Sequence, residues 1–422
     1  MFFIFNILFL VVVAFLAGLS CARQTKFSSS WFQNIYIPFI VLVIICWMFQ
    51  APWFWVIIQF VLQVIALNLG MRYQRKRLTI EDIDRIEKVS DLQLSRSLPA
   101  HCKDEDIAVV LMNMGGPSNI AEVEPFLRRL FNDPLILRFP FAQSFFADLL
   151  IRSRLKEVQA RYQLIGGGSP LLASSIKQVE ALSKELQQRG RKIAIFLNFN
   201  YSAPLPLETI AEIKKAGRKY ILLLGLYPHY SLSTTASNIF YLKEEAKKNY
   251  PRAQFLESYS YHIYEGYVQA FVDRIKESLK PNESLNDFYL LFSAHGTPFY
   301  FLEEGDPYSF LVSQTISQIL GSLKRQDHWS ISYQSAVGPL LWLQPSTDAM
   351  LKTLARKGVE KLIVVPISFV TDHIETLCEI DMEYRHMAQE VGIKDFRMTK
   401  AIECHPGFIN ALADCIEKSL AK

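Results

Sequence analysis

The chain has 422 residues, of which 50% are hydrophobic and 20% charged, a balance that excludes a disordered or low-complexity protein. Its net charge of +4 is too small to favour nucleic acid as a partner. Six cysteines are scattered without a CxxC pair, which argues against a disulfide framework and against a common zinc or iron–sulfur motif. We therefore expect a large folded core in a reducing compartment.

The first hundred residues are dominated by apolar segments. Residues 2–22 and 27–71 contain no charged side chain. A membrane-spanning helix needs about 20 apolar residues, and Pro52 divides the second run. We expect residues 1–78 to be a membrane anchor of three transmembrane helices, at roughly 2–20, 35–50 and 53–70. The alternative for the first run is a cleaved signal peptide, although no basic residue precedes it.

Basic residues predict the orientation of this anchor. Arg23 and Lys26 follow the first run, and four basic residues lie between Arg72 and Arg77 after the third. Three passes place both groups on one side, which the positive-inside rule makes the cytoplasm. We expect the rest of the chain to face the cytoplasm from the inner membrane, after a connecting helix or linker at 79–104.

Residues 105–285 are predicted to form a first α/β half. A buried strand runs into the tight turn that begins at Met114, and a helix is expected to begin after Pro170. Three glycines precede that proline, but the Gly-Lys-Ser/Thr ending of a phosphate loop is absent. Strands following helical segments indicate a βαβ pattern. The predicted strands are 107–113, 192–199 and 220–226.

Residues 286–422 are predicted to form a second α/β half, whose last helix is a candidate to pack on the first half. Its strand 288–294 ends at His295, and its strand 361–367 ends in a polar turn that contains His373. The next segment has a helical pattern and carries Glu375, Glu379 and Glu383 at every fourth position, on one face. Two such halves would leave a cleft between their strand ends.

The polar residues at these strand ends are candidates for chemistry. His295 and His373, together with the carboxylates of Glu375 and Glu379, suit proton transfer or an encounter with a divalent metal. The alternatives are a hydrogen-bonded structural histidine and a solvated acidic helix face.

Seven ordered motifs between about residues 105 and 420 resemble one family. The sequence is similar to the ferrochelatases, the terminal haem-synthesis enzymes, which insert ferrous iron into a porphyrin. The motifs are MNMGGP at 112–117, YQLIGGGSP at 162–170, YPHYSLSTT at 227–235, SAHGTP at 293–298, GDPY at 305–308, YQSAVGPLLWLQPSTD at 333–348 and FVTDHIETLCEIDMEY at 369–384.

The resemblance implies two Rossmann-like domains with parallel sheets facing a porphyrin cleft. It implies that His295 and Glu375 carry the central chemistry as pyrrole proton acceptor, metal ligand or both, with His373 and Glu379 as further catalytic residues. Insertion removes two pyrrole protons, so a base must lie against the macrocycle. Fe²⁺ is then a substrate, and we expect no prosthetic group and no iron–sulfur cluster.

The resemblance also implies a set of porphyrin-binding residues. Met114, Trp342 and Phe369 match positions that line the pocket, and Met114 is the residue expected for protoporphyrin IX rather than coproporphyrin. The positions that hold propionates match Arg154 (aligned by spacing alone), Tyr162 and Ser169, where a guanidinium and hydroxyls would bind carboxylate. Tyr201 completes the expected substrate-binding set.

The chain departs from the family in the segment Phe199–Pro204. Members usually carry an arginine and a histidine where this chain has Asn200 and Ala203. This departure leaves open a non-catalytic, membrane-bound porphyrin- or haem-binding homologue, and a coproporphyrin III chelatase is a separate enzymatic alternative. The expected partners are porphyrin, ferrous iron and membrane lipid, with the preceding haem-pathway oxidase as a further candidate.

Overall fold

The structure is a computed structural model that describes residues 98, 102–137, 143–258, 260–336 and 341–421. The expected transmembrane helices lie outside the described residues, as does nearly all of the expected linker. Within the described ranges, no helix combines the length and the apolar character needed to cross a bilayer.

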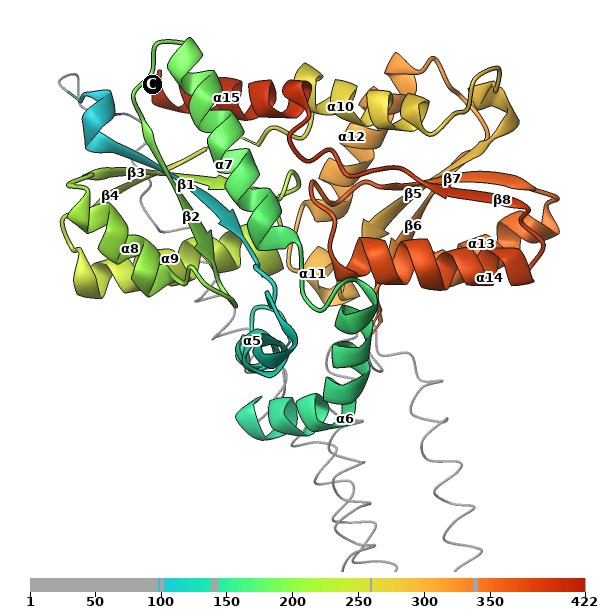
Figure 1. The fold of residues 1–422 in the computed structure, drawn as a ribbon, viewed down its shortest axis with the longest axis horizontal. Coiled ribbons are helices and arrows are strands. Elements are labelled where there is room, and N and C mark those ends of the chain that lie inside the picture. Colours follow the sequence, from blue (N-terminus) through green and yellow to red (C-terminus); the bar gives the residue numbers. More distant parts are fainter. Residues whose placement is uncertain (1–97, 99–101, 138–142, 259, 337–340, 422) are drawn as a thin grey trace, which may run out of the picture. The chain divides into compact units, whose positions relative to one another are not determined.

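Two four-stranded parallel sheets form the framework (Figure 1). The first has the order β2-β1-β3-β4 and the second the order β6-β5-β7-β8, so β1 and β5 hold equivalent places. This confirms the α/β class with two parallel sheets. The strands are β1 (Ile107–Asn113), β2 (Ala194–Phe199), β3 (Tyr220–Gly225), β4 (Gln254–Glu257), β5 (Tyr289–His295), β6 (Trp329–Gln334), β7 (Lys361–Pro366) and β8 (Asp395–Met398).

Buried apolar runs explain why the central strands form where they do. All seven residues of β1 and all six of β3 are buried, as is usual for parallel strands covered on both faces. Alternate residues of β1 enter different cores: Val109 faces the large central cluster, whereas Val110 packs under α8 (Pro206–Lys215) and α9 (Ser237–Asn249).

Helices connect the strands and cover both sheets (Figure 1). In the first half they are α5 (Val123–Asn132), α6 (Gln143–Leu164) and α7 (Leu171–Gln188), which begins directly after Pro170 as predicted, followed by α8 and α9. A short π-helix, η4 (Leu232–Ala236), leads into α9. The later helices are α10 (Glu265–Glu277), α11 (Phe299–Glu303), α12 (Tyr308–Ser322), α13 (Thr347–Arg356), the π-helix η6 (Glu375–Tyr384), α14 (Arg385–Glu390) and α15 (Pro406–Leu420).

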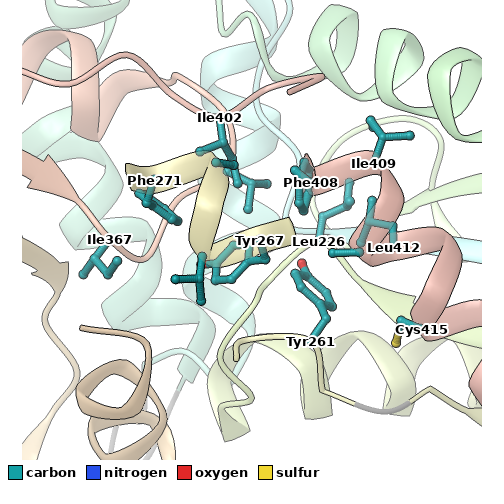
Figure 2. Packing of buried hydrophobic residues seen from close by; sticks show 14 of the residues in the cluster. Leu226, Tyr261, Tyr267, Phe271, Ile367, Ile402, Phe408, Ile409, Leu412 and Cys415 are labelled. Carbon is teal, nitrogen blue, oxygen red and sulfur yellow. The ribbon is translucent and has the colours of Figure 1, made fainter. Parts of the chain in front are cut away.

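One hydrophobic core joins the two halves. It contains Leu226 from the first half, Ile367 from the second, and the inner face of α15, including the fully buried Phe408 (Figure 2). Arg189 at the end of α7 also binds Asp414 and Glu417 of α15, at 2.5 and 2.9 Å. The C-terminal helix therefore packs on the first half, and the strand ends of both halves are held by one shared core.

Candidate functional site

His295 is the last residue of β5, and its side chain has a defined tautomer. Its Nδ1 lies 2.6 Å from the carbonyl oxygen of Gly296, which can only accept, so Nδ1 carries the hydrogen. In the neutral ring Nε2 is then unprotonated and can accept a proton. The imidazole is half-buried at the carboxyl end of a parallel strand, where reactive side chains of α/β proteins are usually found.

The backbone of His295 is fixed on both sides. Its N–H donates to Ser368 Oγ at 3.3 Å, and its carbonyl accepts from the Tyr308 hydroxyl at 3.0 Å. Tyr308 and Ser368 also bond to each other at 2.6 Å. All three contacts are satisfied if the Ser368 hydroxyl donates to Tyr308. The position of the imidazole is therefore set by a closed ring of hydrogen bonds.

Gly296 allows the chain to pass closely under Trp342. A Cβ at this position would lie 2.7 Å from the Gln334 carbonyl oxygen and 3.4 Å from the Trp342 ring. The Gly296 N–H donates to that same carbonyl at 2.8 Å. A side chain here would push against backbone, so glycine is required next to the histidine, and the predicted site residue Trp342 lies close to this turn.

His373 and Glu375 form an ion pair beyond the end of β7. His373 Nε2 lies 2.9 Å from Glu375 Oε2, while its Nδ1 donates to the Thr371 carbonyl at 3.0 Å. Both ring nitrogens face acceptors, so the doubly protonated imidazolium satisfies both contacts. Only 13% of the His373 side chain and 29% of the Glu375 side chain are exposed.

Charge rather than burial decides the protonation of this pair. Burial lowers the pKa of His373, but the Glu375 carboxylate, the Thr371 carbonyl and Asp372 together outweigh it, so the pKa lies above its usual value. Burial raises the pKa of Glu375, but His373, with a smaller contribution from His295, lowers it to about 2. The Glu375 carboxyl is therefore ionised at neutral pH, the shift of His373 favours its imidazolium form, and His295 lies within electrostatic reach of the carboxylate.

Phe369 lies between the two histidines. Its ring centroid is 4.3 Å from that of His373 and 6.1 Å from that of His295, with both pairs edge to face. Phe369 therefore contacts both imidazoles near the ends of β5 and β7. The predicted residues His295, His373, Glu375 and Phe369 therefore form one cluster.

The predicted row of glutamates lies on a π-helix, η6, instead of an α-helix. π-Helices are rare and often occur at functional sites. Each carboxylate has its own partner, which offsets the repulsion that like charges at this spacing produce. Glu379 accepts from Ser335 N, Ser335 Oγ and the Tyr384 hydroxyl at 2.9, 2.6 and 2.9 Å. Glu383 binds Arg161 of α6 at 3.1 Å.

The first half reaches this cluster through α6. Tyr162 is 4% exposed and packs with Tyr201 in a hydrophobic cluster that Met114 and Ile374 also contact. Burial raises the pKa of the Tyr162 hydroxyl, and the charge of Glu375 raises it further. Tyr162, Met114 and Glu375 are therefore neighbours across the two halves.

Tyr201 is buried in a network of its own. It is 3% exposed, and its hydroxyl donates to Asp133 at 2.5 Å. Asp133 also accepts from Ser237 and Tyr241 at 3.0 Å each. Asn200, at the position where the family usually has arginine, donates to Ser237 at 3.0 Å. The described side chains bonded to Asp133 are thus neutral.

The two expected propionate residues other than Tyr162 are placed differently. Ser169 belongs to the glycine-rich loop, which packs on the turn after β1: its N–H donates to Pro117 O at 2.7 Å, and a Cβ on Gly168 would lie 2.3 Å from Ser118 O. Arg154 is a half-buried residue of α6. The loop is therefore built for close backbone packing, with Ser169 next to the Met114 turn.

Sequence reasoning missed the residues that support the site. Gln334 accepts from Ser293 at 2.7 Å and donates to the Glu375 carbonyl at 3.3 Å, joining β5, β6 and η6. Tyr308, Ser368 and Asp133 were also missed. Gln334, Tyr308 and Asp306 do lie within the quoted motifs, which was the available signal. Among the described residues, no group of three or more His, Cys, Asp or Glu side chains is arranged to hold a metal ion.

Comparison with known proteins identifies the family of this chain. Residues 106–420 match the family model described as Ferrochelatase. The chain is 41% identical over 320 residues to the ferrochelatase of Synechococcus elongatus and 40% to that of a Synechocystis species, covering 74% of this chain and 82% of each relative. Among solved structures, SirB from Bacillus subtilis with Fe³⁺ is similar with a TM-score of 0.46 and 14% identity, over 75% of this chain and 96% of that one. The chain belongs to the ferrochelatase family and is an enzyme that inserts iron into protoporphyrin.

Proposed function

We propose that this lyase inserts Fe²⁺ into protoporphyrin IX in the last step of haem biosynthesis, using the second half of the chain for the chemistry. Two pyrrole N–H bonds break, the four ring nitrogens each form a bond to iron, and two protons leave. The observation that carries the proposal is the contact of His295 Nδ1 with the Gly296 carbonyl, which leaves Nε2 as the acceptor of the neutral ring, close to the His373–Glu375 ion pair.

In this proposal His295 takes a proton from the macrocycle. Its fixed tautomer presents a lone pair, and its anchored backbone holds that lone pair in one place. Once protonated, the imidazolium is stabilised by the Glu375 carboxylate, which stays ionised because its pKa is held at about 2. His373 keeps that carboxylate charged and oriented.

Iron enters as a substrate and not as a resident cofactor. His295 and Glu375 are the proposed first ligands, since imidazole nitrogen and carboxylate oxygen both bind ferrous iron. Glu379 is proposed to support proton movement from its place between Ser335 and Tyr384. We propose that no iron–sulfur cluster is needed; iron and sulfide analysis of the purified protein tests this, and a stoichiometric cluster would contradict it.

Porphyrin binding is proposed to involve both halves. Met114, Trp342 and Phe369 supply apolar and aromatic contacts to the macrocycle, while Arg154, Tyr162 and Ser169 would bind its propionates. Tyr201 is proposed to shape the pocket from within, since its hydroxyl is bonded to Asp133.

We also propose that the chain is anchored in the cytoplasmic membrane with the catalytic part facing the cytoplasm. The long uncharged runs at 2–22 and 27–71 support this, as do Phe145 and Leu149 of α6, which lie one turn apart and are 65% and 57% exposed. Sodium carbonate should leave the full chain in the membrane pellet, whereas release into the supernatant would contradict the anchor. The same location would suit contact with the preceding haem-pathway oxidase, which co-purification in mild detergent would test.

The activity is tested by anaerobic Fe²⁺ insertion with the detergent-solubilised full chain and its His295→Ala variant. We expect turnover of protoporphyrin IX by the wild type and loss of turnover in the variant. Faster turnover of coproporphyrin III would instead identify the coproporphyrin form. Tight porphyrin binding without insertion by the wild type would identify a binding protein.

A further inference from the structure

Asp306 joins the two halves of the molecule at a buried position behind His295. It is 4% exposed. Its Oδ2 accepts from the Ser231 hydroxyl at 2.7 Å and from the Leu232 N–H at 2.9 Å, both in the first half. Its Oδ1 accepts from the N–H of Tyr308 at 2.9 Å, in the second half. One carboxylate therefore links the start of η4 with the start of α12.

The surroundings of Asp306 suit a charged carboxylate held by hydrogen bonds. Both groups of donors lie at the first residues of helical segments, where backbone N–H groups favour negative charge. Burial raises the pKa of Asp306, and these hydrogen bonds offset only part of that rise. Asparagine at this position would place its NH₂ group against at least one N–H or O–H donor, so the hydrogen-bond donors favour aspartate over asparagine.

Tyr308 carries this link on to His295. Its N–H is bonded to Asp306, and its hydroxyl contacts the His295 carbonyl at 3.0 Å and Ser368 at 2.6 Å. The residue is buried at 7% exposure. A continuous chain of hydrogen bonds therefore connects Ser231 to His295 through Asp306 and Tyr308.

We propose that Asp306 and Tyr308 are positioning residues for His295. Through them, the hydrogen bonds that Asp306 makes to the first half fix the position of the His295 imidazole. The inference rests on the proposed role of His295 as proton acceptor. Neither residue touches the reacting atoms. Their loss should therefore slow the chemical step and leave porphyrin binding nearly unchanged, because a displacement of about 1 Å at a reacting group can cost up to about a hundredfold in rate.

The test compares four variants of the full chain in anaerobic Fe²⁺ insertion, with porphyrin KM, kcat and thermal unfolding measured for each. Tyr308→Phe removes the hydroxyl that holds His295, and we expect kcat to fall about tenfold with KM within about twofold. Tyr267→Phe is the matched control, since Tyr267 is fully buried and its hydroxyl has no hydrogen-bond partner in the described structure. It should keep the wild-type kcat.

Asp306→Asn and the double variant show whether the two residues act along one route. If Asp306 acts through Tyr308, the double variant should have the kcat of the slower single variant, and not the product of the two losses. Multiplied losses, or a wild-type kcat in Tyr308→Phe, would overturn the inference while leaving the proposed function in place. A wild-type protein that inserts no iron would overturn both.

Discussion

The two halves share one sheet topology but differ in the chemistry at their strand ends. β1 ends at Asn113 and β5 ends at His295, and both strands hold the same place in their sheets. Beyond β1 and β2, the buried carboxylate of Asp133 is bonded to neutral hydroxyls. Beyond β5 and β7, an ion pair lies near an imidazole with a free lone pair. The two halves thus have the same sheet topology, but the ion pair and the imidazole at the strand ends belong to the second half.

The largest expected effect comes from removing the charge in the second half. Glu375→Gln should lower kcat by about a hundredfold, since the His295 imidazolium loses its counter-charge. It should also lower the pKa of His373, which NMR titration of the ring would show. Glu360→Gln is the control, because Glu360 pairs with Lys394 on an exposed surface. An unchanged kcat in Glu375→Gln would remove the proposed difference between the halves.

A smaller effect on kcat is expected when a methyl group is added at Gly296, next to His295. Gly296→Ala should lower kcat about tenfold and stability by roughly 1–3 kcal/mol, because the new methyl meets the Gln334 carbonyl. Gly321→Ala in α12 is the matched control: its Cβ meets open space, and it should stabilise by about 0.5–1 kcal/mol. Steady-state kinetics and urea unfolding measure both. Equal behaviour of the two variants would contradict the close packing at Gly296.

In the first half we expect an effect on stability more than on rate. Tyr201→Phe leaves Asp133 short of one hydrogen bond and should cost about 1–3 kcal/mol in free energy of unfolding. We expect kcat to change less than about threefold. Tyr267→Phe, which loses no hydrogen bond, should cost clearly less. A large loss of kcat at full stability would show that Tyr201 takes part in the chemistry.

The smallest effect is the dependence of stability on pH through the His373–Glu375 pair. The pKa of His373 is raised in the folded state, so its contribution is full below about 6.5 and is lost as pH rises through the higher folded value. The pKa of Glu375 is lowered from 4.5 to about 2, so its contribution is present above 4.5 and lost as pH falls towards 2. The stability difference between wild type and Glu375→Gln should therefore be largest between about pH 4.5 and 6.5. A difference that does not vary with pH would contradict the ion pair.

The central strands could be predicted because their residues are continuously apolar. β1 begins and ends where the pattern 107–113 placed it, and the strand predicted at 288–294 differs from β5 by one residue. The strands β4 and β8 were missed because they are four residues long and partly exposed, so no periodic pattern distinguishes them from loops. β6 was missed as well.

The site could be predicted only in part, because partners far apart in sequence do not appear in local patterns. His295, His373 and Glu375 follow strands or polar turns and were found. The spacing of Glu375, Glu379 and Glu383 indicated a common face but could not show the π-helix, nor that the three carboxylates bind different partners. The long-range partner of Asp133, Tyr201, is known only from the folded chain.

The central claim is that His295, and not its counterpart at the end of β1, accepts the proton that leaves the porphyrin. The most direct measurement is anaerobic Fe²⁺ insertion by His295→Ala and Asn113→Ala variants, each assayed with and without added imidazole. We predict that His295→Ala loses at least about a hundredfold in kcat and is partly rescued by imidazole, while Asn113→Ala loses less than about tenfold and gains nothing from imidazole. Near-wild-type insertion by His295→Ala, or an equal loss in both variants, would contradict the account.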